Sequence, residues 1–432
     1  MEITDRAVAP DRSRQPEVVI PQNVGIMNAE LYGSPAGVRI YSLRAAGYGV
    51  VRVSFVFRAG SAWQTVPFCA SATANNLSEG SRNMTAVQIA ERLDYYGSYF
   101  DVSIDRDWSV VTFVCLTRFF DDTMALAKEI LLEPAFPEDE LRVYCDKSRQ
   151  NLAINRTKVD FVARELFGRS IYGASHPYGV SSPESAYDTL SRDDVRGFYG
   201  KFYTAANCFV VVSGDVDDKK LETLARFVGE LPTGAAVADV RFPEPAGVAR
   251  AEEEFPKAVQ SAIRVGRVLF PRGHADFIGM QVVAMALGGY FGSRLVRTLR
   301  EEHGYTYGAY SAMVNFDRSG YIAMATEVGA QFTDAALEDI MAEVEKLRRE
   351  EMPAEELALV KNIMAGEVMR IMDGPFGVAD VTIENLQNGF DNGYITSFIE
   401  QVRGITPQRV RELARRYLAP EDLTTVVVGA RR

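Results

Sequence analysis

The segment Phe209-Val-Val-Val-Ser-Gly214 has a counterpart in Thr425-Val-Val-Val-Gly429, and Val428 follows Val212 by 216 residues in a chain of 432. Both segments are short, uninterrupted runs of valine that end at glycine. Such a run is typical of a strand that is buried on both faces of a sheet. Because the offset is half of the chain length, this pair predicts two halves with the same fold.

Three further pairs of similar segments occur in the same order in the two halves, and each pair opens a predicted helix. They are Phe120-Asp-Asp-Thr-Met-Ala-Leu126 with Phe332-Thr-Asp-Ala-Ala-Leu337, Phe136-Pro-Glu-Asp-Glu-Leu141 with Met352-Pro-Ala-Glu-Glu-Leu357, and Leu190-Ser-Arg-Asp-Asp-Val195 with Ile405-Thr-Pro-Gln-Arg-Val410. Ordered matches at a nearly constant offset indicate an internal duplication. We therefore predict a first domain at residues 18–235 and a second at residues 250–432. Residues 1–17 are expected to form an N-terminal arm, and residues 236–249 a linker.

Local patterns predict the elements of the first half. Apolar runs predict strands at Val38–Leu43, Val50–Phe57, Tyr99–Ile104 and Ser109–Leu116. A Thr85/Gln88 capping box opens one helix, and further helices are predicted at Asp121–Leu132, Pro137 to about Lys158, Asp160–Ile171 and Ser191 to near Tyr203. Because strands and helices come in mixed order, we expect an α+β fold. Each domain is expected to be a largely antiparallel, mixed sheet with helices packed on one face.

Composition and charge exclude several classes of function. The net charge is −11 and the basic residues form no stripe, so we expect neither a nucleic acid partner nor a membrane partner. The N-terminus has no apolar signal core, and no run approaches the roughly 18 apolar residues of a spanning helix. Four cysteines, at positions 69, 115, 145 and 208, are widely spaced without a Cys-x-x-Cys motif. This usage predicts reduced thiols in a cytoplasmic protein.

Several longer motifs follow one another along the chain. The first half contains Phe57-Arg-Ala-Gly-Ser-Ala62 and His176-Pro-Tyr-Gly179, and the second half contains Leu287-Gly-Gly289 followed by Gly292-Ser-Arg-Leu-Val-Arg-Thr-Leu-Arg300-Glu-Glu-His-Gly-Tyr-Thr-Tyr307. With these motifs in this order, the chain resembles the pitrilysin, insulinase and mitochondrial-processing-peptidase family of zinc metallopeptidases over nearly its whole length. The resemblance implies two homologous domains that together form a half clamshell.

Active members of that family carry His-x-x-Glu-His on a helix and a more distant Glu, which bind zinc and supply the catalytic base. In this chain the two histidine positions correspond to Ser71 and Asn75, and the base corresponds to Ala74. The distal ligand corresponds to Gln150 or Asn151. These neutral side chains are poor zinc ligands, and alanine cannot accept a proton. We therefore predict a degenerate metal site without metal or cofactor, in which the neutral polar side chains hydrogen-bond one another.

The histidines support the same prediction without any alignment. The chain has three, His176, His274 and His303, and none lies within five residues of another. A helical His-x-x-x-His pair is therefore impossible anywhere in the sequence. A site that gathers the three in space is disfavoured, because they stand in a turn, in a loop and at a helix end, where each has a local explanation.

The resemblance assigns peptide binding to Arg300 and Tyr307. In the family, an Arg and a Tyr with this spacing bind backbone carbonyls of the peptide near the scissile bond, and both side chains are strong donors. Alternatively, Arg300 caps a helical turn and Tyr307 fills a strand face. The family also binds peptide as an added strand at a sheet edge. Asp101, in Phe100-Asp-Val102, departs from the Asn-Ala of that edge, which puts strand addition in doubt.

These patterns predict a zinc-less, non-catalytic subunit of a heterodimeric peptidase. A partner of the same family would carry the zinc, while Arg300 and Tyr307 would bind the peptide substrate. The alternative is a catalytically silent homodimer that serves as a structural scaffold. The sequence contains no nucleophile elbow and no persuasive triad, so we do not expect activity from the chain alone.

Overall fold

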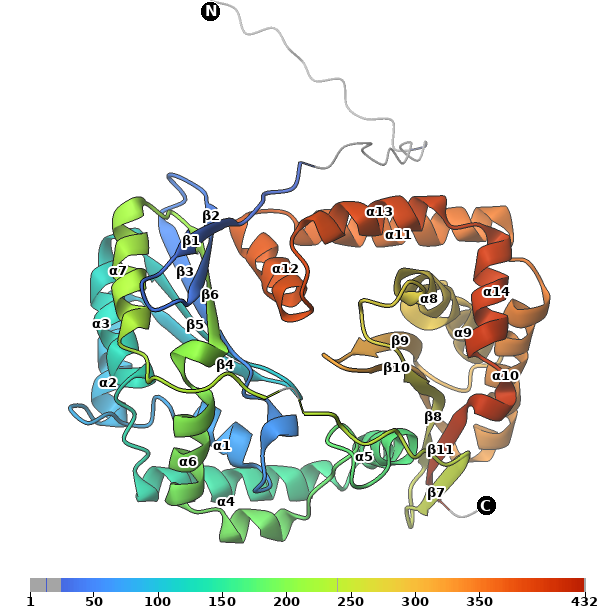
Figure 1. Ribbon diagram of the computed structural model, residues 1–432. Coiled ribbons are helices and arrows are strands. Elements are labelled where there is room, and N and C mark those ends of the chain that lie inside the picture. Colours follow the sequence, from blue (N-terminus) through green and yellow to red (C-terminus); the bar gives the residue numbers. More distant parts are fainter. Residues whose placement is uncertain (1–12, 14–24, 239, 431–432) are drawn as a thin grey trace, which may run out of the picture.

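The structure is a computed structural model that describes residue 13 and residues 25–238 and 240–430. Figure 1 shows two halves, one coloured blue to green and the other yellow to red, each built around one β-sheet. The predicted arm at residues 1–17 lies outside the described residues, apart from Ser13. No helix in the described part of the chain is long and apolar enough to cross a lipid bilayer.

The sheet of the first half has six strands in the order β1-β2-β6-β3-β5-β4. All neighbouring strands are antiparallel except β2 and β6, which run parallel. The open edges of the sheet are therefore β1 and β4. The strands are β1 Glu30–Gly33, β2 Arg39–Arg44, β3 Val50–Phe57, β4 Tyr99–Ile104, β5 Ser109–Leu116 and β6 Cys208–Gly214.

The sheet of the second half has five strands in the order β7-β11-β8-β10-β9, and its single parallel pair is β7 with β11. Without β1, the two strand orders correspond one to one, and the parallel pair occupies the same place in both sheets. The prediction of two homologous α+β units with mixed, largely antiparallel sheets is confirmed. The strands are β7 Arg250–Glu254, β8 Gln260–Leu269, β9 Ala309–Asn315, β10 Gly320–Gly329 and β11 Thr424–Gly429.

Each half also contributes seven α-helices within the described residues. Those of the first half are α1 Cys69–Asn75, α2 Ala86–Tyr96, α3 Phe120–Leu131, α4 Glu138–Asn155, α5 Val159–Tyr172, α6 Arg192–Phe202 and α7 Asp218–Gly229. Those of the second half are α8 Phe277–Ala284, α9 Arg294–Val296, α10 Thr333–Arg349, α11 Ala354–Ile371, α12 Pro375–Gln387, α13 Gly393–Gly404 and α14 Pro407–Tyr417. Two π-helical turns, Met285–Gly289 and Arg297–Glu302, interrupt the region around α9.

Each sheet carries helices of its own half on one face and one helix of the other half on the opposite face (Figure 1). Helix α5 packs on β8 and β11, where Leu166 joins a cluster with Val426 and Val428. Helix α12 packs on β2 and β6, where Ile383 lies in a cluster with Phe209. The predicted layer of helices thus covers only one face of each sheet. A helix from the other half covers the opposite face.

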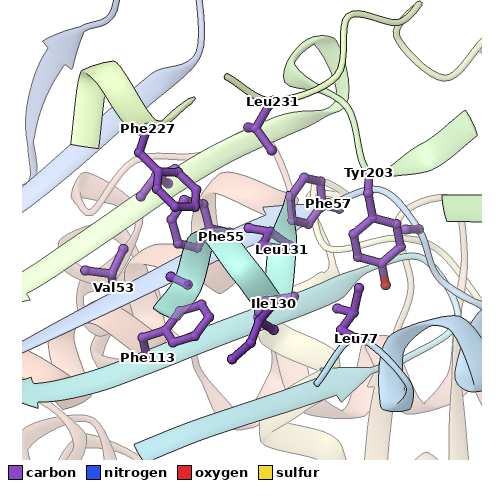
Figure 2. Packing of buried hydrophobic residues seen from close by; sticks show 14 of the residues in the cluster. Val53, Phe55, Phe57, Leu77, Phe113, Ile130, Leu131, Tyr203, Phe227 and Leu231 are labelled. Carbon is purple, nitrogen blue, oxygen red and sulfur yellow. The ribbon is translucent and has the colours of Figure 1, made fainter. Parts of the chain in front are cut away.

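Burial on both faces explains the continuous apolar runs in the central strands. Figure 2 shows Phe55 and Phe57 of β3 against Tyr203 and Phe227, with ring centroids 5.0 Å apart for Phe55 and Phe227 and 4.8 Å apart for Phe57 and Tyr203. Val56 points to the opposite face, towards α12, and is also fully buried. In a strand with one face in solvent, apolar and polar residues would alternate along the sequence instead.

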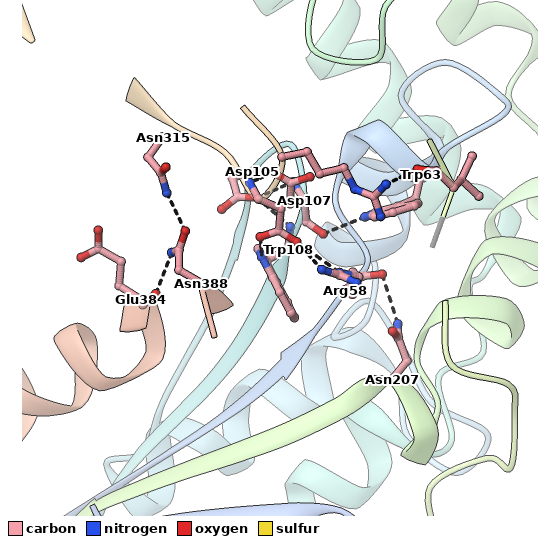
Figure 3. A network of polar contacts seen from close by, with 12 residues as sticks. Arg58, Trp63, Asp105, Asp107, Trp108, Asn207, Asn315, Glu384 and Asn388 are labelled. Carbon is pink, nitrogen blue, oxygen red and sulfur yellow. Dashed lines mark hydrogen bonds and ion pairs between the residues drawn. The ribbon is translucent and has the colours of Figure 1, made fainter. Parts of the chain in front are cut away.

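A buried polar network joins the halves where the β4–β5 and β9–β10 hairpins meet (Figure 3). The carboxylate of Asp317, 5% exposed, accepts hydrogen bonds from Arg58 Nη2 at 2.6 Å and from the Trp108 indole at 2.7 Å. The Asp317 backbone N–H donates to Asp107 Oδ2 at 3.0 Å, and the Tyr178 hydroxyl donates to Asp107 Oδ1 at 2.7 Å. Because the Asp107 and Asp317 carboxylates are buried, the hydrogen bonds that pair them fix how the halves meet.

Gly60, in the Phe57–Ala62 motif, supports the same hairpin. Its backbone N–H donates to the Asp107 carbonyl at 3.0 Å. A Cβ atom at this position would lie 2.4 Å from the carbonyl carbon of Arg106, which is far inside van der Waals contact. The motif therefore requires glycine here because the two backbones approach each other closely.

The carboxyl group of Asp107 makes this junction sensitive to pH. Burial, together with the neighbouring carboxylate of Asp317, raises the pKa of Asp107 to about 6, whereas an unfolded aspartate titrates near 3.9. The folded chain therefore binds this proton more tightly than the unfolded chain does. As a result, the contribution of Asp107 to the free energy of unfolding falls as pH rises from about 4 to about 6.

We expect Asp107→Asn to be more stable than the wild type by roughly 2 kcal/mol at pH 7, with little difference at pH 4. The amide keeps an acceptor for the Asp317 N–H and offers a donor to the Tyr178 hydroxyl, but it carries no charge. Urea unfolding of both proteins at the two pH values measures the effect. A stability difference that is the same at both values would contradict the assignment.

Candidate functional site

Helix α1 occupies the place predicted for the degenerate metal site. Ala74 is fully buried, Ser71 is half-buried and Asn75 is exposed. The Ser71 hydroxyl donates to the Phe68 carbonyl at 2.9 Å, and the Asn75 amide donates to the Ser71 carbonyl at 2.8 Å. Phe68 precedes the helix in a left-handed conformation with φ of 62°, and its ring stacks on Tyr187 with centroids 4.0 Å apart.

The residues of α4 that face α1 are Tyr144 and Ser148. The Tyr144 hydroxyl lies near the side chains of Ser71, Asn75 and Ser148, and burial raises the pKa of Tyr144. Ser148 also lies near Tyr187, whose pKa burial raises to about 12. Both tyrosines therefore stay neutral at physiological pH, and the side chains beside α1 form a neutral polar group.

Gln150 and Asn151, the two positions considered for the distal ligand, are both exposed. In the described structure, neither forms a hydrogen bond with α1. The reason is the phase of α4, in which Leu141, Tyr144 and Ser148 recur every three or four residues on the inward side. Positions 150 and 151 fall outside that stripe. The three- to four-residue spacing of the inward positions in α4 is the sequence signal that could have identified Tyr144 and Ser148 as the residues facing α1.

The chemistry of this group does not suit a metal ion. Ser71, Asn75, Tyr144 and Ser148 offer only neutral oxygen and amide groups, whereas zinc requires imidazole, thiolate or carboxylate ligands. Among the described residues, no three His, Cys, Asp or Glu side chains come together in a way that could hold a metal ion. The arrangement can rigidify α1 but cannot activate a water molecule.

Each of the three histidines has a local role. The buried His176 accepts a hydrogen bond from the Tyr178 N–H at its Nδ1 atom, and burial lowers its pKa. His274 stacks on Phe270 with centroids 3.8 Å apart. His303 pairs with Asp339 at 2.7 Å.

The glycine-rich motif of the second half forms unusual backbone. Its residues run from the π-helical turn Met285–Gly289 through α9 into the second turn, Arg297–Glu302. π-Helical turns are rare and occur frequently at functional sites. Gly288 allows the first turn to lie directly on β9, since a Cβ atom there would be 2.3 Å from the Ser311 nitrogen.

Arg300 lies in the second π-helical turn, and its guanidinium sits 4.5 Å from the centre of the exposed Phe291 ring. Tyr307 lies in the loop before β9 and is 93% exposed. Its side chain forms no hydrogen bond or ring contact with the described residues. Tyr307 therefore does not fill a strand face. Arg300 is half-buried, and the two side chains lie on neighbouring segments of one motif.

The open edge strand β4 lies beside α1. Its outward residues are Tyr99, Asp101 and Ser103, which are all exposed. Its unpaired backbone groups are geometrically able to accept an additional strand. Asp101 places a negative charge on this edge, so an acidic peptide would be repelled there.

Comparison with known proteins identifies the relatives of this chain. Residues 189–364 match the family model described as the peptidase M16 inactive domain. This part of the chain is therefore similar to that family. The chain is 20% identical over 354 residues to the "Uncharacterized zinc protease YmxG" of Bacillus subtilis, covering 81% of this chain and 85% of that protein. It is also 20% identical over 363 residues to the "Non-peptidase homolog YmxG" of Helicobacter pylori, covering 82% and 83%.

Solved structures share the fold of this chain. A peptidase M16 inactive domain from Pseudomonas fluorescens superposes with a TM-score of 0.85 at 22% identity and covers 94% of this chain and 99% of that chain. A protease from Helicobacter pylori gives a TM-score of 0.81 at 17% identity, with 93% and 100% covered. The predicted family resemblance and fold are thereby confirmed, for a homologue that lacks the zinc motif.

Proposed function

We propose that this chain is a zinc-less subunit of a heterodimeric peptidase, in which Arg300 and Tyr307 bind the peptide that a zinc-bearing partner cleaves. The observation that carries the proposal is the contrast between two sites. The positions of the metal motif carry only neutral side chains, Ser71, Ala74 and Asn75, whose hydrogen bonds go to the backbone of their own segment. Tyr307, by contrast, is 93% exposed and has no partner among the described side chains.

The chemistry of Arg300 and Tyr307 suits peptide carbonyl groups. A guanidinium and a phenol are strong hydrogen-bond donors, and donors aimed at a carbonyl oxygen stabilise the negative charge that develops there during hydrolysis. The ring of Phe291 holds the Arg300 guanidinium by a cation–π contact and so orients it. The partner would supply the metal-activated water, which this chain cannot.

The proposal includes a cytoplasmic location, which the thiols support. All four cysteines are free, and burial raises the pKa of Cys69 and of Cys115 to about 11. Buried thiols of this kind are unreactive. Reduced, inert cysteines are typical of proteins in a reducing compartment.

The experiment that tests the proposal is purification of the tagged chain from its native cell, followed by identification of bound proteins and metal analysis. We expect a stoichiometric partner of similar length that contains His-x-x-Glu-His, and about one zinc ion per pair. A dimer of this chain alone, without zinc, would overturn the proposal. That result would support the alternative, a catalytically silent scaffold homodimer.

A further inference from the structure

A cavity of about 450 Å³ lies in the second half, apart from both sites described above. Residues of α8, the first π-helical turn, β9, α11, α12 and α13 line it, and neither Arg300 nor Tyr307 is among them. Figure 1 shows α12 on one side of this region and α8 with β9 on the other. Because α12 is packed on the first sheet, one wall of the cavity is held in place by the contact between the halves.

The walls of the cavity are largely apolar and adaptable. Four methionines, Met285, Met313, Met364 and Met372, line it together with Phe398. Methionine side chains are flexible and polarizable, and they recur at surfaces that accept several different apolar partners. The volume lies within the range of small-ligand sites in proteins. These walls favour large apolar side chains without demanding one shape.

Several buried polar atoms of the lining residues have no hydrogen-bond partner in the described structure, among them Gln281 Oε1, Ser311 Oγ, the Tyr394 hydroxyl and Arg272 Nε. Ser311 is only 3% exposed. Buried polar groups are nearly always paired, and an unpaired one lowers the stability of the folded chain. Polar atoms left unpaired among the residues that line a largely apolar cavity are the arrangement expected of a binding site.

The carboxylates of the cavity lie at its rim, where Glu367 and Glu384 are both exposed. The Arg272 side chain is only 11% exposed and is paired with Glu384, and its guanidinium lies 4.5 Å from the centre of the Tyr394 ring. The lining therefore carries two carboxylates against one guanidinium that is already paired. An anionic ligand is therefore disfavoured. The interior atoms Gln281 Oε1 and Ser311 Oγ are neutral and require a ligand that donates as well as accepts, as an amide does.

We infer that this cavity binds an uncharged peptide segment, with one or two large apolar side chains inside it and a backbone amide against Gln281 and Ser311. The inference rests on the proposed function in taking the ligand to be a peptide. It adds a second anchoring point and a preference for apolar, non-acidic sequence. The cavity would hold the peptide in the second half while Arg300 and Tyr307 engage another part of it.

Calorimetric titration of the full-length chain with the blocked hexapeptide acetyl-Ser-Gly-Leu-Phe-Gly-Ser-amide tests the inference. We expect a dissociation constant in the micromolar to millimolar range, and no binding when Ser-Ser replaces Leu-Phe. Gln281→Met and Ser311→Ala should each weaken binding about fivefold or more, because each removes a hydrogen-bonding atom. Both should leave the melting temperature unchanged or raise it, because the lost atom is unpaired without ligand. If Gln281 and Ser311 served only to stabilise the fold, the two substitutions would lower the melting temperature.

Ser42→Ala is the matched control. Ser42 lies in β2 of the first sheet, is 1% exposed and also has an unpaired hydroxyl. This variant should keep wild-type peptide affinity. Wild-type affinity in Gln281→Met and Ser311→Ala, or tighter binding of decanoate than of the peptide, would overturn the inference, as would no binding at all.

The titration also separates this inference from the proposed function. If Arg300→Ala abolishes peptide binding while the cavity variants do not, the peptide binds at the Arg300 site, and only the cavity inference fails. If the cavity variants lose binding and no zinc-bearing partner is ever found, the cavity stands and the heterodimer proposal fails.

Discussion

Arg300→Ala is expected to lower kcat/KM of the pair reconstituted with its zinc-bearing subunit by about 100-fold. The removed guanidinium is the strongest donor near the peptide carbonyl in the proposed arrangement, and loss of one such donor costs about 10²–10³ in rate. Tyr307→Phe should cost about tenfold, because a neutral phenol is a weaker donor. Hydrolysis of a fluorogenic peptide by the reconstituted pair measures both effects.

Arg297→Ala is the control for Arg300→Ala. Arg297 belongs to the same π-helical turn and is 53% exposed, and its guanidinium lies 3.7 Å from Glu302. Tyr95→Phe, at a position 79% exposed in the first half, controls for loss of a phenol. Neither control should change kcat/KM more than about twofold. If Arg300→Ala lowers kcat/KM no more than Arg297→Ala does, Arg300 does not bind the peptide, and the result supports the alternative of a structural scaffold.

The second large effect is on stability. Asp317→Ala should lower the free energy of unfolding by about 3 kcal/mol, because it leaves the Arg58 guanidinium and the Trp108 indole N–H without their acceptor at the junction of the halves. Removal of one carboxylate beside Asp107 offsets part of this loss. Urea unfolding at pH 7, monitored by tryptophan fluorescence and by circular dichroism, provides the measurement.

Asp380→Ala is the matched control for Asp317→Ala. Its carboxylate also pairs across the halves, with Arg52 at 2.5 Å, but it is 59% exposed. A solvated pair of this kind contributes less than about 1 kcal/mol. Equal losses from the two variants would show that burial of the Asp317 network does not matter for the contact between the halves.

The sequence predicted those elements whose signals are local. The hairpin at Tyr99–Ile104 and Ser109–Leu116 has the predicted bounds. The capping box is present with both of its hydrogen bonds, from the Gln88 N–H to the Thr85 hydroxyl and from the Thr85 N–H to the Gln88 side chain. In these cases the residues that define the element also make its contacts, so no distant part of the chain is needed.

Features that depend on distant contacts escaped prediction. The packing of α5 and α12 on the sheet of the other half has no local signature, although the continuous valine run at Phe209–Gly214 already required cover on both faces. The same holds for the degenerate metal site. Alignment to a zinc motif pointed to Gln150 and Asn151, but both are exposed, and the inward positions of α4 belong to Tyr144 and Ser148. The cavity was invisible because its lining comes from six separate segments.

The reciprocal cover of the sheets has a consequence for synthesis of the chain. When the first half leaves the ribosome, the face of its sheet that carries Phe209 and Val211 has no cover until residues 375–387 have been made. Helix α5 must likewise wait for β8 and β11. Neither half can therefore complete its folding before the chain is nearly finished. The nascent first half should display an apolar surface for most of its translation, which is the feature that chaperones bind.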